Sequence, residues 1–110
     1  MRTRHFGACA LACAALVWAA PAAASDPPDL ELGEEINYVC AGCHGEYGQG
    51  GSDGEYPRLA GQPAPYIERQ LHLFRSRERP NIPMLEYVDE RQMPDSDIED
   101  VAAFLAQIEL

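Results

Sequence analysis

The chain contains no lysine. All eight of its basic residues are arginines, set against 18 aspartate and glutamate residues, so the formal net charge of the 110-residue chain is −10. A surface this acidic repels phosphate backbones and anionic lipid headgroups, which excludes nucleic acid as a partner and electrostatic attachment to membranes. The same charge favours partner proteins that present basic patches, although it could also serve solubility alone.

Long hydrophobic runs are missing too. The one extended apolar stretch, residues 6–20, is shorter than the roughly 20 residues that a membrane-spanning helix needs. It has a basic front and runs into small residues that suit cleavage between Ala24 and Ser25. We therefore predict a signal peptide over residues 1–24, export to the periplasm, one domain over residues 25–110 and no stable membrane insertion after cleavage. An uncleaved anchor is the alternative.

Cysteine is scarce. Of four cysteines, Cys9 and Cys13 lie in the predicted leader, which leaves Cys40 and Cys43, followed at once by His44. On a helix, thiols three positions apart can reach the two vinyl groups of one porphyrin, and the histidine then faces the iron as an axial ligand. This C-x-x-C-H pattern indicates one covalently bound haem c with its iron.

Two other interpretations of this motif remain open. A redox dithiol needs no histidine and usually accompanies a βαβ pattern, of which the sequence shows no sign. A structural zinc site needs a fourth ligand, and His72 is the only further histidine outside the leader and the motif.

Apolar residues recur at helical spacing in three segments and at strand spacing in none. Pro65 and Pro94 suit the first turns of the second and third segments. The segments lie at residues 30–44, 66–74 and 94–108, joined by a glycine-rich loop over residues 45–61 and an irregular connection over residues 78–93 with room for one short helical turn. We predict an all-α domain too small for a large core of its own, to which a bound haem would add.

This layout resembles the class I cytochromes c, in particular small bacterial monohaem proteins and single domains of dihaem relatives. The resemblance covers residues 30–110 and implies three main helices plus loops wrapped around one haem. Four pieces carry it: the run Cys40 to Gly45, the run Tyr56 to Gln62, the helix Tyr66 to Phe74 and the acidic start of the closing helix at Pro94.

The resemblance also implies roles for single residues. The Pro57 carbonyl would accept a hydrogen bond from His44, and Leu59 would pack at the haem edge. Gly33 would mark the crossing of the first and last helices, near Ala103 and Phe104.

The sixth iron ligand would be a methionine from the loop before the last helix. Met84 has the expected placement, although its distance from the closing helix is slightly long. Met93 is the alternative because it directly precedes Pro94. Either could instead fill the core.

With a histidine nitrogen on one side of the iron and a methionine sulfur on the other, the implied function is one-electron transfer between redox proteins, not enzymatic catalysis. The rival is a haem enzyme or sensor with a displaceable sixth ligand, acting on peroxide or a small gas. Five arginines are candidates to bind haem propionates, or are simply solvated surface charges: Arg58, Arg75, Arg77, Arg79 and Arg91.

Overall fold

The computed structural model describes residues 18–21 and 26–110. Its elements are α1 (Leu30–His44), the short 3-10 helix η1 (Ser52–Gly54), α2 (Ala64–Ser76), α3 (Ile82–Val88) and α4 (Asp95–Ala106). The described residues form no β-strand, only an isolated bridge between Gly51 and Tyr56. The prediction of an all-α fold with three main helices is confirmed.

Local chemistry explains where these helices begin and end. The side chain of Asp29 accepts a hydrogen bond from the Leu32 amide at 3.0 Å and so caps α1. Pro65 lies in the first turn of α2, where its missing N–H has no intrahelical partner to lose. The same helix ends at Arg77, whose φ of 66° is left-handed.

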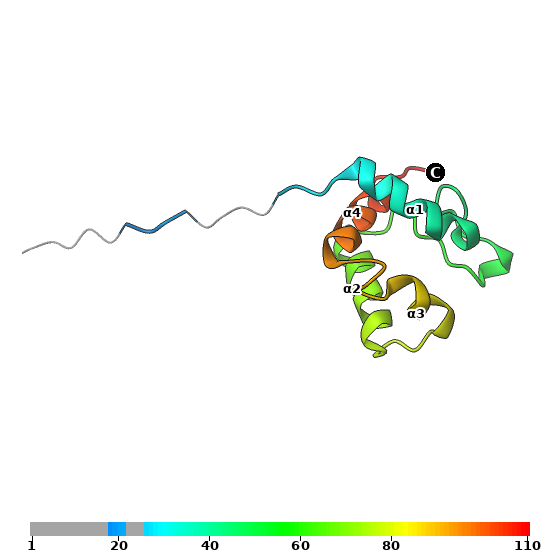
Figure 1. Ribbon diagram of the computed structural model, residues 1–110. Helices are drawn as coiled ribbons and strands as arrows, with labels where there is room; N and C mark the ends of the chain where they lie inside the picture. Colours follow the sequence, from blue (N-terminus) through cyan, green and yellow to red (C-terminus); the bar gives the residue numbers. More distant parts are fainter. Residues whose placement is uncertain (1–17, 22–25) are drawn as a thin grey trace, which may run out of the picture.

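Helix α1 crosses α4, α2 packs against α4 on another side, and α3 packs against α2 (Figure 1). At the crossing, a Cβ on Gly33 would lie 2.3 Å from the Asp100 carbonyl oxygen and 2.8 Å from Phe104 Cβ. Only glycine permits this approach. The predicted crossing is confirmed at Phe104, with Asp100 in place of Ala103 as the second contact. The Asp100 carboxylate also accepts from the Asp29 amide at 2.8 Å.

The core lies where α2 meets α4. Its buried cluster consists of Ile67, Val101, Ala102 and Leu105. Cys40 and Leu59 pack against this cluster while only partly buried. The cysteine motif at the end of α1 is thus attached directly to the core and not carried on a loop.

The connection over residues 78–93 is more regular than the sequence suggests. Helix α3 spans seven residues, about two turns, in the segment where the sequence left room for one short helical turn. Asn81 caps this helix through a 3.1 Å hydrogen bond from the Met84 amide, and Pro83 occupies its first turn. Met84 therefore lies on a helix and not in a loop.

Most of the predicted leader, including the cleavage position after Ala24, lies outside the described residues. Within the described part of the chain, no helix combines the length and apolarity required to traverse a bilayer.

Candidate functional site

The two cysteines of the motif lie in the last turns of α1. Cys43 is exposed, whereas Cys40 is half-buried against the core. Burial penalises the charged thiolate and raises the pKa of the Cys40 thiol to about 11. Helical spacing directs both sulfurs to the same side of α1, as thioether bonds to a single flat group require.

His44 is the last residue of α1 and is buried, with 7% of its surface exposed. Its Nδ1 lies 2.7 Å from the carbonyl oxygen of Pro57. Because a carbonyl only accepts, Nδ1 carries a proton, so in the neutral ring Nε2 keeps its lone pair. The ring also meets the edge of Tyr56 at 73°, with centroids 6.1 Å apart. Neutral imidazole with a free Nε2 is the form that binds a metal.

The loop after α1 folds back so that Pro57 reaches His44. The Gly50 amide donates to the His44 carbonyl at 2.7 Å, and the Leu59 and Ala60 amides donate to the Gly48 carbonyl at 2.8 and 3.0 Å. Gly50 has a φ of 83°, and a Cβ there would lie 2.8 Å from the Tyr56 carbonyl oxygen. The sequence predicts a loop in this stretch, but it does not show which glycine permits the close approach.

Asn37 is a site residue that the sequence analysis missed. It lies on α1 two turns before His44, is 4% exposed, and its Nδ2 donates to the Glu46 carbonyl at 3.3 Å. Its Oδ1 is buried with no hydrogen-bond partner among the described residues. A polar residue within an otherwise apolar helix face was the available signal. Asn37 thus ties the start of the loop back to α1.

The two candidate methionines occupy different environments. Met93 is buried, with 5% of its surface exposed, whereas Met84 is half-buried on α3. His72 is exposed on α2. Among the residues that the structure describes, no group of three or more His, Cys, Asp or Glu side chains is disposed to hold a metal ion, so the zinc interpretation gains no ligand set.

Leu59, which the resemblance places at the haem edge, is partly buried against the core cluster. Two thiols and an imidazole thus lie together at the C-terminal end of α1, with one imidazole nitrogen engaged by Pro57. The candidate sulfur ligands, Met84 and Met93, lie on the segment that follows α2. Two thiols and an imidazole at this spacing can bind a flat apolar group covalently and supply a nitrogen ligand to a metal at its centre.

Comparison with known proteins gives a family match over residues 30–109, to the family described as cytochrome c. The chain is 39% identical to cytochrome c4 of Azotobacter vinelandii over 67 residues, which are 53% of this chain and 32% of that protein. It is 42% identical to the thiosulfate dehydrogenase electron acceptor of Thiomonas intermedia over 71 residues, 64% of this chain and 30% of that protein.

Among solved structures, cytochrome c4 of Acidithiobacillus ferrooxidans aligns with a TM-score of 0.68 at 30% identity. The alignment covers 78% of this chain and 53% of that one. The chain thus spans about a third of the length of the two curated relatives and about half of the solved chain.

Proposed function

The chain belongs to the cytochrome c family, and from this premise we propose that it is an exported monohaem one-electron carrier with His44 and Met84 as the axial iron ligands. The family binds haem c covalently through a Cys-x-x-Cys-His motif, and this chain has that spacing at Cys40, Cys43 and His44. One motif outside the leader corresponds to one haem.

The observation that carries the proposal is the hydrogen bond between His44 and Pro57. It selects the imidazole tautomer whose Nε2 can bind iron, fixes the direction of the ring and makes the imidazole a stronger donor. A histidine with a purely structural role would have no need of a free Nε2. The exposed Cys43 and the half-buried Cys40 supply the two thiols that the thioether bonds of haem c require.

Met84 is the preferred sixth ligand. It lies on a capped helix that follows α2, with its side chain only half-buried. Met93 is already packed in the interior, so its burial is explained without a ligand role. A thioether opposite an imidazole is a soft donor that favours ferrous iron and raises the reduction potential.

Bound haem c supplies an iron that gains and loses one electron. His44 and Met84 would be the residues that hold the iron, and with both bound they would leave no position for a substrate and would limit the rearrangement that accompanies electron transfer. This division of roles supports a carrier over an enzyme.

The acidic surface supports redox partners with basic patches. The Thiomonas relative is itself named as an electron acceptor. By analogy, we propose a dehydrogenase, oxidase or reductase as donor or acceptor, in the periplasm.

The deciding experiment begins with the pyridine haemochrome spectrum and intact mass of the exported protein. One covalent haem and loss of residues 1–24 are expected. Next, the oxidised spectra of wild type, Met84→Ala and Met93→Ala are compared. The methionine-to-iron charge-transfer band should be present in wild type and Met93→Ala and absent in Met84→Ala. A colourless protein would overturn the proposal in favour of a zinc site. A coloured wild type that lacks the band and binds peroxide rapidly would overturn it in favour of a haem enzyme.

A further inference from the structure

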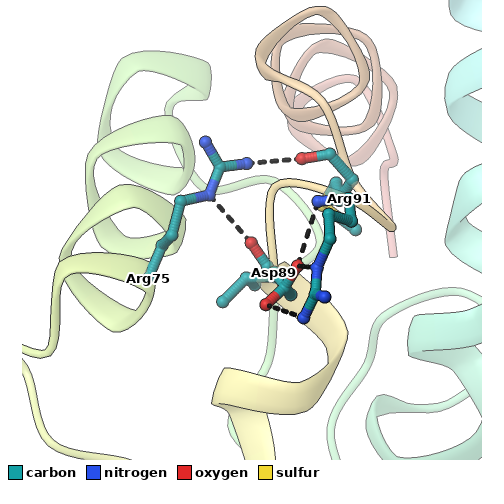
Figure 2. A network of polar contacts seen from close by, with 5 residues as sticks. Arg75, Asp89 and Arg91 are labelled. Carbon is teal, nitrogen blue, oxygen red and sulfur yellow. Dashed lines mark hydrogen bonds and ion pairs between the residues drawn. The ribbon is translucent and has the colours of Figure 1, made fainter.

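One side chain of α2 holds the whole segment between α3 and α4. Arg75 donates from Nε to the Val88 carbonyl at 2.8 Å and from a terminal nitrogen to the Met93 carbonyl. Its other terminal nitrogen pairs with the Asp95 carboxylate. Figure 2 shows the guanidinium between the end of α3 and the turn before α4.

These contacts are partly removed from solvent. The Arg75 side chain is 18% exposed, which excludes for this residue the solvated role that the sequence left open. A planar guanidinium presents its donors in a fixed fork, so it can bind several acceptors at once without further ordering. Hydrogen bonds from a charged group with little solvent access are among the stronger ones in proteins.

The acceptors explain why this position matters. Val88 is the last residue of α3, and its carbonyl has no partner within the helix. Met93 directly precedes Pro94, which caps α4. Arg75 therefore joins the end of α3 and the beginning of α4 to α2. Helix α3, which carries Met84, packs mainly on α2.

We propose that Arg75 is a positioning residue for the sixth iron ligand: by fixing the C-terminal end of α3 and the turn that follows it, Arg75 holds Met84 in place. This inference rests on the proposed function, because it takes Met84 as the ligand. Without the clamp, α3 can move on α2, and an external ligand then competes more easily for the iron.

Arg91 provides a matched control on the same segment. Among the described residues it pairs with Asp89 alone, two positions away, and 90% of its side chain is exposed. Figure 2 shows that this pair folds back on its own turn, whereas Arg75 reaches across from α2. Substitution of either arginine by glutamine removes the same charge, but only Arg75→Gln breaks the link between helices.

The test measures imidazole binding to the ferric haem-loaded protein in wild type, Arg75→Gln, Arg75→Lys and Arg91→Gln. We expect imidazole to bind at least about tenfold more tightly to Arg75→Gln than to wild type. As pH rises, the charge-transfer band of Arg75→Gln should disappear at a lower pH than that of wild type. Arg75→Lys should lie between wild type and Arg75→Gln in imidazole affinity, because one charged donor group remains. Arg91→Gln should match the wild-type imidazole affinity within about twofold.

Several outcomes overturn the proposal. If Arg75→Gln lowers the melting temperature but leaves imidazole affinity unchanged, the residue is merely structural. If it fails to fold, Arg75→Lys and Asp95→Asn replace it, and wild-type affinity in both contradicts the proposal. A wild-type spectrum without the charge-transfer band would instead overturn the Met84 assignment, and this inference with it.

Discussion

The Nδ1 atom of His44 and the carbonyl oxygen of Pro57 lie 2.7 Å apart, although the two residues are 13 positions apart in the sequence. The contact joins the end of α1 to the far side of the glycine-rich loop. It uses a backbone acceptor, so no substitution of the Pro57 side chain removes it directly. The contribution of this hydrogen bond is therefore tested by substitutions in the loop that positions the Pro57 carbonyl.

Gly50→Ala should displace the acceptor of His44. A Cβ there would lie 2.9 Å from the Arg58 amide nitrogen, and its φ of 83° disfavours alanine. We expect a loss of about 2–3 kcal/mol in the free energy of unfolding and a changed reduction potential, measured by denaturant titration and voltammetry. Gly54→Ala is the control, because Gly54 also has positive φ (93°) but open space. Equal losses in both variants would count against a loop held by close packing.

Gly33→Ala should separate α1 from α4. Alanine favours a helix by about 1 kcal/mol over glycine, yet here its methyl group would overlap the backbone of Asp100. We expect net destabilisation of about 2–3 kcal/mol by thermal or denaturant unfolding. Gly42→Ala, on the same helix with nothing near its Cβ position, should be neutral or stabilising at equal haem content. Equal or greater stability of Gly33→Ala would show that the crossing tolerates a side chain.

Met93→Ala should destabilise the domain without changing iron ligation. The side chain is 5% exposed, and truncation of a buried methionine leaves a cavity that lowers the free energy of unfolding by about 2–5 kcal/mol. Met93→Leu keeps the volume and should lose less than about 1.5 kcal/mol. Loss of the charge-transfer band in Met93→Leu would identify Met93 as the ligand.

The pKa of the Asp89 carboxyl should lie below its ordinary value. Hydrogen bonds from the Arg91 side chain, then from its backbone, lower the pKa of the Asp89 carboxyl below its ordinary value. A lowered pKa means that the pair contributes fully above the unfolded-state pKa and is lost as pH falls through the folded-state value. NMR titration of the Asp89 carboxyl should show a lowered midpoint that rises in Arg91→Gln. An unchanged midpoint in that variant would disprove the pairing in solution.

Electron transfer should depend on salt with a sign set by the partner. Loss of residues 1–24 removes two arginines and no acidic residue, so the net charge changes from −10 to −12. The exported protein should be oxidised more slowly by a tripositive cobalt complex as ionic strength rises, because screening removes the attraction. With ferricyanide, an anion, the rate should increase instead. Stopped-flow measurements over a range of salt concentrations check both slopes. Two slopes of the same sign would mean that the overall charge does not govern encounter.

The main helices and the cysteine motif could be predicted because their signals are local. Helical spacing, the prolines at helix starts and Gly33 each depend on residue type at a fixed position. Helix α3 was underestimated because seven residues are too few for a clear periodicity. Asn37 was missed, and the partners of Arg75 were not foreseen, because the acceptors include backbone carbonyls, which every residue type offers.

The crossing of α1 over α4 also orders the steps of biogenesis. Helix α1 contains both thiols, but α4, on which it packs, follows it in the chain, so α4 is synthesised later and, in an exported chain, reaches the far side of the membrane later. Until then α1 has no partner, and Cys40 is open to the machinery that attaches the porphyrin. Closure of the two helices buries part of Cys40 against the core, so attachment should come before the final folding step.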